Sequence, residues 1–324
     1  MKKKVVVTDY NFENVNIERN IFEEAGYEFE EYKCKTVKET IEVTKDAYGI
    51  LNQYAPLSEE VISGLNNCKA IARYAIGVDN IDITKATEKG ILVSKVSGYC
   101  INEVADHTIA LLLNMARKLY ILDKNIKNKK WDYKVAKPIF RLQKSTVGII
   151  GFGEIGRNVA QRLKAFNFEK ILVYDPFVTR EAIDKYGATK MDLNDIITQS
   201  DYIVINAPLN KDTYHLINKE RFNMMKNNVV IINTGRGPLI DEKSLIEALK
   251  ENKIGGVALD VTEIEPIQWD NPLLNFENVF ITPHCAWYSE DSQKDLQTTA
   301  AKNLLLALEG KIHPDIVNPE ALLK

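Results

Sequence analysis

A short apolar run that ends in three closely spaced glycines constrains the fold of this chain more than any other segment. Residues 146–150 read Thr-Val-Gly-Ile-Ile, Gly151, Gly153 and Gly156 follow, and a helix is expected at 157–166. Three such glycines alone are common by chance, but a strand, these glycines and a helix in this order form a turn that binds a dinucleotide pyrophosphate. Gly151 permits the tight turn, Gly153 lets the backbone approach the phosphates, and Gly156 lets the helix lie close to the strand. An ordinary strand-to-helix turn is the alternative.

A carboxylate follows the next expected strand. Asp175 ends the run Ile171-Leu-Val-Tyr-Asp, nineteen residues after Gly156. At this position of a dinucleotide-binding fold, a carboxylate accepts hydrogen bonds from the ribose hydroxyls and repels a 2′-phosphate. NAD is therefore expected in preference to NADP, although Arg180 could weaken that discrimination. A simple Asp-Pro turn at Asp175 is the alternative interpretation.

Short β-rich runs alternate with helical stretches along the chain. Because parallel strands need a crossover long enough to hold a helix, this alternation predicts α/β domains with parallel sheets. Five such runs lie in the first hundred residues, at 4–8, 27–32, 48–52, 68–74 and 91–96. Six more lie at 146–150, 171–175, 201–206, 228–233, 256–260 and 279–283. The sequence therefore predicts two successive α/β units.

Two further helical segments are expected outside this alternation. From residue 101, apolar residues recur at helical spacing through Met115, so a long amphipathic helix is expected to lead out of the first unit. The polar and basic segment 127–134 is expected to form a connection on the surface. Residues 291–310 are helical in pattern and too short to form another domain.

Length and charge exclude several classes of protein. A chain of 324 residues is long enough for about two domains. Its formal charge of −3 offers no broad basic surface, so nucleic acid is not expected as a partner. No run is apolar and long enough for a membrane span or a signal peptide, and a cytoplasmic location is expected. The four cysteines are scattered singly without a CxxC pair, which favours reduced thiols and no metal.

Six motifs together resemble the D-isomer-specific 2-hydroxyacid dehydrogenase family over almost the whole chain. Besides the glycine segment, they are Arg73–Asp82, Gly98–His107, Asn233–Gly237, Asp260–Pro266 and Thr282–His284. The resemblance implies two Rossmann-like, doubly wound parallel-sheet domains: an NAD-binding domain inserted into a flavodoxin-like catalytic domain. The expected boundaries are 1–100 and 289–324 for the catalytic domain and 101–288 for the NAD-binding domain. A homodimer that associates through residues 101–145 is also implied.

The resemblance implies roles for individual residues. Arg236 matches the substrate-binding arginine, and Glu265 and His284 match the acid/base pair. The backbone of Ile76 and Gly77 matches the segment that receives the substrate carboxylate. Asp260 would face the nicotinamide amide, with a capping aspartate as the alternative. The expected NAD-binding residues are Thr108, Gly151, Gly153, Glu154, Ile155, Gly156, Asp175, Ala207, Pro208, Thr213, Thr234, Gly235, Asp260 and His284.

The residue types suit the reduction of a 2-oxo acid on chemical grounds as well. That reaction needs a hydride from a nicotinamide, a proton for the developing alkoxide and a fixed cation for the carboxylate and carbonyl oxygens. The planar fork of Arg236 can hold a carboxylate and polarise a carbonyl. His284 can supply the proton near neutral pH, and Glu265 would orient the ring and favour its protonated form. Taken singly, each could be an ordinary loop residue, and His107, in the expected helix after residue 100, is interpreted as structural.

Some positions depart from the family pattern. Asn206–Ala207 stands where the family often has His-Cys, and Lys95 and Ser97 replace the common Asn and Pro, which bears on cofactor affinity and substrate choice. The run Cys285–Glu290 resembles the C-terminal-binding proteins and their bacterial relatives, in which the tryptophan lines the substrate pocket. Trp287 is thus a candidate specificity residue, or else a domain-interface aromatic.

Two functions of different classes follow. The first is an NAD-dependent enzyme that interconverts a small 2-oxo acid and its D-2-hydroxy acid. The second is an NAD-sensing, corepressor-like binding protein with incidental turnover, because the corepressor relatives retain Arg236, Glu265 and His284. Within the enzyme class, the formate dehydrogenases of the family carry Gln at the position of Glu265, which disfavours that activity. Phosphoglycerate dehydrogenase activity stays an open alternative.

Overall fold

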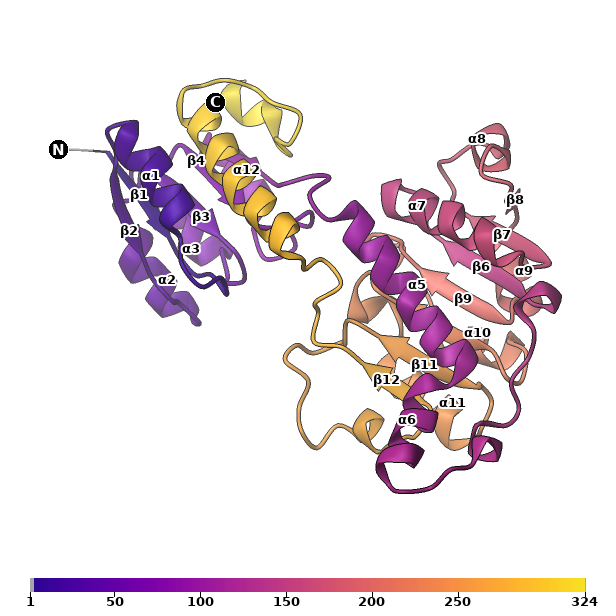
Figure 1. The fold of residues 1–324 in the computed structure, drawn as a ribbon. Helices are drawn as coiled ribbons and strands as arrows, with labels where there is room; N and C mark the ends of the chain where they lie inside the picture. The colour runs from indigo at the N-terminus through magenta and orange to yellow at the C-terminus, as the bar shows by residue number, and fades with distance from the viewer. Residues whose placement is uncertain (1–2, 324) are drawn as a thin grey trace. The chain divides into compact units, whose positions relative to one another are not determined.

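The computed structural model describes residues 3–323, which divide into two compact units (Figure 1). One unit combines the segment up to Tyr99 with the segment from Ser289 onward, and the other is Cys100–Tyr288. The family resemblance predicts boundaries after residues 100 and 288. Each unit is built around its own parallel sheet, so the α/β fold class is confirmed.

The first unit contains a five-stranded parallel sheet in the order β2-β1-β3-β4-β5. These strands are β1 (Lys4–Val7), β2 (Glu28–Glu31), β3 (Gly49–Asn52), β4 (Ala70–Arg73) and β5 (Leu92–Ser94). This strand order is that of flavodoxin-like folds, as expected for this unit. Its helices are α1 (Asn16–Glu24), α2 (Val37–Thr44), α3 (Glu59–Ser63), α4 (Ile83–Glu88) and α12 (Glu290–Leu308), with a final 3-10 turn at Pro319–Leu323. Helices α1 and α12 lie side by side, so the C-terminal segment completes the N-terminal fold (Figure 1).

The second unit contains a seven-stranded parallel sheet in the order β12-β11-β10-β9-β6-β7-β8. Its strands are β6 (Thr146–Ile150), β7 (Lys170–Tyr174), β8 (Thr189–Lys190), β9 (Tyr202–Ile205), β10 (Val230–Asn233), β11 (Gly256–Leu259) and β12 (Val279–Ile281). Counted from β6, this is the Rossmann order with one added strand at the β12 edge. The two-residue strand β8 was not predicted, because it is too short to produce a pattern in the sequence.

Seven helices of the described chain belong to the second unit. They are α5 (Ile101–Arg117), α6 (Leu119–Lys127), α7 (Glu154–Leu163), α8 (Arg180–Asp184), α9 (Leu193–Gln199), α10 (Lys219–Met224) and α11 (Glu242–Lys250). Five 3-10 turns lie at Tyr133–Ala136, Leu142–Lys144, Lys164–Phe166, Gly237–Leu239 and Pro272–Asn275. Helix α5 begins at the predicted residue and buries the apolar residues that define its pattern. Residues 127–134 are exposed, as predicted for the surface connection, although Lys127 ends α6 and the 3-10 turn Tyr133–Ala136 begins within this segment.

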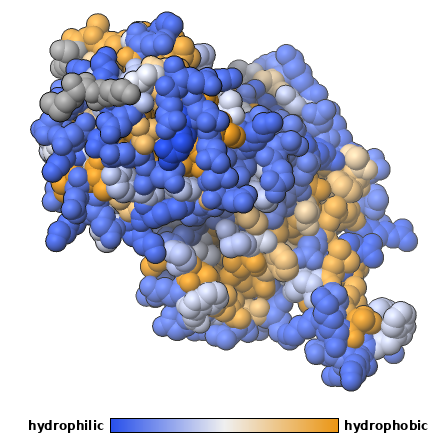
Figure 2. Space-filling model, turned by 60° about the vertical axis from the view of Figure 1, so that its left-hand side comes forward, coloured by the Kyte–Doolittle hydropathy of each residue, from blue (hydrophilic) through white to orange (hydrophobic). Residues whose placement is uncertain are grey.

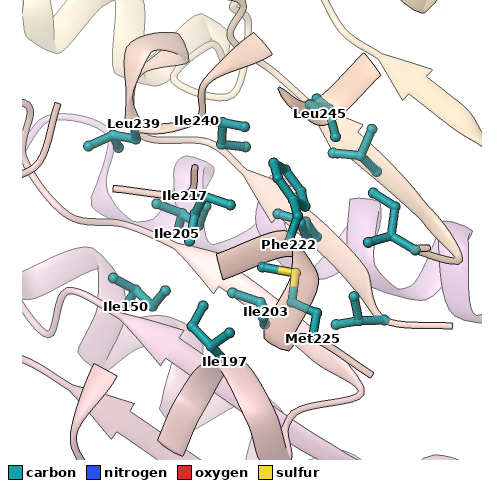
Figure 3. Close-up of a cluster of buried hydrophobic side chains, with 14 of the residues drawn as sticks. Ile150, Ile197, Ile203, Ile205, Ile217, Phe222, Met225, Leu239, Ile240 and Leu245 are labelled. Carbon is teal, nitrogen blue, oxygen red and sulfur yellow. The ribbon is translucent and has the colours of Figure 1, made fainter. Parts of the chain in front are cut away.

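Two hydrophobic cores cover opposite faces of the seven-stranded sheet. In β9, Tyr202 and Val204 belong to the core that includes α5 and α7, whereas Ile203 and Ile205 belong to the core that includes α9, α10 and α11. Figure 3 shows the second of these cores, with Ile203 and Ile205 among Phe222 and Met225. Because side chains alternate along a strand, a strand buried on both faces must be apolar throughout. This explains why these strands read as unbroken apolar runs.

The face of the molecule drawn in Figure 2 is covered mostly by hydrophilic residues. Hydrophobic residues lie among them in smaller groups on that face. Within residues 3–323, no helix combines the length and the apolar character that crossing a bilayer requires.

Candidate active site

Six strands of the second unit each end next to a residue that the sequence analysis singled out. Parallel strands present their carboxyl ends at one edge of the sheet, where ligands of open α/β sheets bind. Strands β6, β7, β9, β10, β11 and β12 are followed directly by Gly151, Asp175, Asn206, Thr234, Asp260 and Thr282. The fold therefore brings these positions to one edge, although up to 131 residues separate them in the sequence.

The glycine turn after β6 has the geometry that the sequence predicts. Gly151 has φ +91°, and a Cβ there would lie 2.5 Å from the backbone nitrogen of Ala207. A Cβ at Gly156 would lie 2.3 Å from the carbonyl oxygen of Gly151. A side chain at either position would collide with backbone, which explains both glycines. Gly153 differs from them, because a Cβ there would meet open space.

The open space at Gly153 adjoins the start of α7. The helix begins at Glu154, three residues earlier than the expected start at 157, because Gly153 is its N-cap and Gly156 lies within its first turn. No side chain caps this end, so the N–H groups of the first turn are available to a ligand. A helix N-terminus of this kind attracts phosphate through its N–H groups and its dipole. The turn therefore fits a dinucleotide pyrophosphate, and the NAD-binding roles expected for Glu154 and Ile155 stay predictions.

Asp175 ties the glycine turn to the loop after β7. Its Oδ2 accepts a hydrogen bond of 2.8 Å from the backbone of Phe152, and its Oδ1 accepts bonds from Phe177 and Val178. The Asp-Pro turn that was the alternative interpretation is thus present. It does not exclude a contact with a ribose, because each carboxylate oxygen can accept more than one hydrogen bond.

A buried polar cluster lies beside the glycine turn. The Thr108 hydroxyl donates to the carbonyl of Val104 at 2.7 Å and lies 2.8 Å from the Thr234 hydroxyl. Asn206 Nδ2 donates to that Thr234 hydroxyl at 3.2 Å. Within residues 3–323, the buried Oδ1 of Asn206 has no hydrogen-bond partner. An unpaired buried acceptor is unfavourable by about 1–3 kcal/mol, so a ligand N–H or O–H would be stabilised at this position.

The loop after β9 is braced by Thr213. Its hydroxyl donates to the carbonyl of Pro208 at 2.6 Å and accepts from the backbone of Asn210 at 2.8 Å. Ala207, at the start of this loop, is the residue that approaches Gly151. Thr213 therefore holds the shape of the segment next to the glycine turn.

The loop after β10 presents Arg236. Buried Asn233 closes it, because Asn233 Nδ2 donates to the carbonyl of Arg236 and Asn233 Oδ1 accepts from the backbone of Gly235. The Arg236 guanidinium donates to the carbonyl of Gly235 at 2.9 Å. A Cβ at Gly237 would lie 1.8 Å from the carbonyl oxygen of Thr262, so this loop packs directly on the loop that carries Glu265.

Glu265 and His284 form a close pair. Oε2 of Glu265 lies 2.6 Å from Nδ1 of His284, and Oε1 accepts from the backbone of Thr262 at 3.0 Å. The two side chains are 36% and 31% exposed. Among the described residues, nothing is hydrogen-bonded to Nε2 of His284. The ring therefore has one nitrogen held by a carboxylate and one that can exchange a proton with a ligand.

Asp260 holds the loop that carries His284. Its side chain is 1% exposed, and its oxygens accept from the backbones of Cys285 (3.0 Å) and Ala286 (2.9 Å) and from the Thr282 hydroxyl (2.5 Å). Its backbone carbonyl accepts from the backbone of His284 at 2.8 Å. These bonds hold a loop and not a helix N-terminus, and the contact expected between Asp260 and the nicotinamide amide stays a prediction.

The side chains of His107 and Cys285 lie near Asp260. His107 belongs to α5, but its Nε2 lies 3.1 Å from the Thr282 hydroxyl, so it reaches the site from a helix rich in apolar core residues. Burial and the neighbouring Asp260 carboxylate raise the pKa of the Cys285 thiol, which favours the protonated, unreactive form at neutral pH. Thr282 begins one of the motifs given above and His107 ends another, but neither motif indicates that the two side chains meet.

Trp287 lies directly beyond the histidine loop. Its indole Nε1 donates to the carbonyl of His284 at 3.0 Å, and its ring packs edge-on against Tyr288 with centroids 5.6 Å apart. Ile76 and Gly77 follow β4 in the other unit, and their role in substrate binding stays a prediction.

Ligand atoms of a possible cation site lie together in two groups of the described residues: His107, Asp260 and Cys285, and His215, Asp241 and Glu263. The atoms of each group lie within 4.8 Å of one another. Members of both groups already accept hydrogen bonds from the backbone: Glu263 accepts from Glu242 at 3.1 Å, and Asp260 accepts from Ala286 at 2.9 Å. The expectation that the protein holds no metal stays a prediction.

Residues 109–286 match the D-isomer specific 2-hydroxyacid dehydrogenase, NAD binding domain. This match covers more than half of the chain and includes the glycine turn, Arg236, Glu265 and His284. The chain belongs to the D-isomer-specific 2-hydroxyacid dehydrogenase family.

Relatives extend the similarity beyond the NAD-binding domain. The chain is 39% identical to D-3-phosphoglycerate dehydrogenase of Methanocaldococcus jannaschii over 97% of its own length, but covers only 59% of that relative. It is 34% identical to glyoxylate reductase of Pyrococcus furiosus, over 99% of this chain and 97% of the relative. Among solved structures, D-lactate dehydrogenase of Aquifex aeolicus complexed with NAD and lactic acid superposes with a TM-score of 0.88 at 30% identity, over 97% and 99% of the two chains.

Alanine should have different effects at Gly151 and at Gly153, because only the Cβ at Gly151 would meet backbone. Gly151→Ala should lower the thermal midpoint clearly, because the new Cβ meets the Ala207 backbone at a positive φ. Gly153→Ala should leave the midpoint nearly unchanged, because its Cβ meets open space, but should weaken NADH binding about tenfold or more by obstructing the phosphates. Differential scanning fluorimetry and NADH fluorescence titration measure the two effects. Unchanged NADH affinity in Gly153→Ala would contradict the assignment of the pyrophosphate site.

Proposed function

We propose that this chain catalyses hydride transfer between NAD(H) and a small 2-oxo acid / D-2-hydroxy acid pair. The observation that carries this proposal is the 2.6 Å pairing of Glu265 with Nδ1 of His284, which leaves Nε2 to exchange a proton. It lies in the same unit as the glycine turn and the Arg236 loop. Bound NADH would supply the hydride. The remaining requirements, a proton and a fixed cation, are met by residues of this chain.

In this proposal, His284 donates the proton from Nε2 to the developing alkoxide and accepts it in the reverse direction. Glu265 acts through His284, because its carboxylate holds Nδ1 and sets the direction of the ring. A carboxylate in this position also stabilises the charged ring electrostatically. The backbone bond from Thr262 to Oε1 fixes the carboxylate in turn.

Arg236 binds the substrate anion in this proposal. A guanidinium offers two parallel donors, so it can hold a carboxylate and polarise the neighbouring carbonyl oxygen. Asn233 fixes the backbone on either side of Arg236, and Gly237 lets that backbone lie against Thr262. The position of the guanidinium is thereby coupled to the loop that carries Glu265.

The substrate class is inferred from the relatives. The proteins reported above are named for glyoxylate, D-lactate and D-3-phosphoglycerate. Small 2-oxo acids, with or without a terminal phosphate, are therefore the substrates to test. Trp287 is the proposed specificity residue, because it is bonded to the backbone of His284 and a larger or smaller side chain there would change the space next to the ring.

The acid/base assignment is tested with a panel of glyoxylate, hydroxypyruvate, pyruvate, phosphohydroxypyruvate and bulkier 2-oxo acids. With the best substrate, His284→Ala should lower kcat by about 10²–10⁴-fold, because the proton donor is lost. NADH affinity should change little, since the glycine turn is untouched. Arg236→Lys should raise KM and lower kcat together, because Lys keeps the charge but lacks the two parallel N–H donors of the guanidinium. NADH oxidation followed by absorbance and NADH fluorescence titration measure these effects.

Wild-type turnover in His284→Ala would refute the proton-transfer role. No turnover of the wild-type protein with any member of the panel, together with tight NADH binding, would instead favour the NAD-sensing, corepressor-like function. None of the three relatives reported above is named as a corepressor.

Preference for NAD over NADP is proposed to depend on Asp175. Asp175→Asn should lower the ratio of kcat/KM for NADH to that for NADPH about tenfold or more, because the charge that repels a 2′-phosphate is removed. Asp184→Asn, at an exposed carboxylate of α8, is the matched control and should leave the ratio unchanged. An unchanged ratio in Asp175→Asn would show that another residue discriminates the cofactors.

We propose that the chain forms a homodimer through the segment 119–140. This segment carries seven exposed large hydrophobic residues: Leu119, Ile126, Trp131, Tyr133, Val135, Ile139 and Phe140. Trp131 is 93% exposed, although large apolar side chains at a monomer surface rarely gather in this number. A second copy of the chain would remove them from water.

Light scattering at micromolar concentration tests the dimer. The wild-type protein should have twice the mass of one chain, and Trp131→Asp with Phe140→Asp should be monomeric, because two charges would be buried in the interface. Trp269→Asp is the matched control, since Trp269 is 89% exposed in the same unit but lies outside the segment. A wild-type monomer would refute the proposal.

A further inference from the structure

We propose that His107 is a positioning residue for His284: it anchors the loop 282–286 to helix α5 through Thr282 and Asp260. The inference deepens the proposed function, and rests on it for the role of His284. It starts from a side chain whose sequence surroundings indicate a structural residue of α5.

The contacts link two elements that are far apart in the sequence. His107 Nε2 lies 3.1 Å from the Thr282 hydroxyl and 3.6 Å from Oδ1 of Asp260, and the residues of the first pair are 175 positions apart. Helix α5 packs on β10 and β11, the strands that lead to Arg236 and Asp260. His107 thus connects the loop after β12 to a helix fixed on the sheet.

The number of hydrogens on Asp260, Thr282 and His107 sets the direction of the hydrogen bonds between them. Both oxygens of Asp260 already accept backbone N–H bonds, so Oδ1 is the acceptor in its 2.5 Å contact with the Thr282 hydroxyl. The single hydroxyl hydrogen of Thr282 is then directed at Asp260. The Thr282 oxygen must therefore accept from His107, which requires a hydrogen on Nε2 of His107.

The loop that receives these bonds holds His284 in an unusual conformation. His284 has φ +51°, in the left-handed region that few residues with a Cβ adopt. The backbone N–H groups of residues 284–286 donate to Asp260 and hold the loop in this conformation. His107 is the outermost member of this chain of bonds, and its ring is 24% exposed. Its loss should loosen the loop without removing any group that touches a substrate.

Matched substitutions of His107 test this role. A glutamine amide can place an N–H near the position of Nε2, whereas an asparagine amide places it near Nδ1. His107→Phe and His107→Asn should lower kcat about tenfold or more, because small displacements of a reacting group are enough for such losses. His107→Gln should restore most of kcat. NADH affinity should be unchanged in all three variants, measured well below their thermal midpoints.

The hydrogen bond between His107 and Thr282 is tested by Thr282→Val, which keeps the shape of the side chain but removes the hydroxyl. It should lower kcat as His107→Phe does, and the double variant should be no worse than either single one, because both break the same bond. Equal kcat in wild type, His107→Phe and His107→Asn would overturn the proposal. Equal losses in the Gln and Asn variants would also overturn it, because they would indicate packing rather than a donated hydrogen bond.

A measurement without substrate separates this proposal from the proposed function. The chain has four histidines, so long-range ¹H–¹⁵N spectra can be assigned with single substitutions. The His107 ring should show hydrogen on Nε2, and Thr282→Val should shift that nitrogen signal. A His107 ring with its only hydrogen on Nδ1 would refute the hydrogen-bond chain even in an active enzyme. Absence of turnover in the wild-type protein would instead refute the proposed function and, with it, the role of His107, whatever the spectra show.

Discussion

Parallel strand pairing is the constraint on which the candidate site depends. Because every strand of the seven-stranded sheet runs in the same direction, six carboxyl ends meet at one edge, and each is followed by a site residue. The loops can approach one another only where side chains are absent. Gly151 lets the Ala207 backbone come close, and Gly237 does the same for Thr262. The sheet supplies the common edge, and these glycines supply the short distances between its loops.

Polar side chains hold the loops once they are in place. Asn233 closes the Arg236 loop, Asp175 joins the glycine turn to the next loop, and Asp260 binds the backbone around His284. Each side chain bonds to backbone groups, which ties the loop conformation to the rigid end of a strand. Reactive groups are more exposed than these supports: His284 is 31% exposed and Asp260 is 1% exposed. This division suits a site that must reach a ligand yet keep a fixed geometry.

Much of the fold could be predicted from local pattern. The strands buried on both faces are continuous apolar runs, and α5 shows a helical repeat from its first residue, so both were identified without a structure. Strand β8 was not predicted, because two residues are too few to show a periodic pattern. The start of α7 was predicted three residues too late, because the sequence pattern does not show that Gly153 is its N-cap. The family motifs gave the site residues, but by resemblance rather than by geometry.

The sequence alone determined the fold class and the glycine turn, because both follow from residue types at fixed spacing. Its resemblance to the family supplied the candidate residues Arg236, Glu265 and His284. Only the tertiary structure decided which atoms meet. It brought Glu265 within 2.6 Å of His284, directed the Asp260 carboxylate at the loop 282–286, and placed His107 beside Thr282. Hydrogen bonds between elements depend on helix packing and loop conformation, which no local pattern records. For that reason His107 was interpreted from the sequence as part of a helix and is found in the structure beside the candidate site.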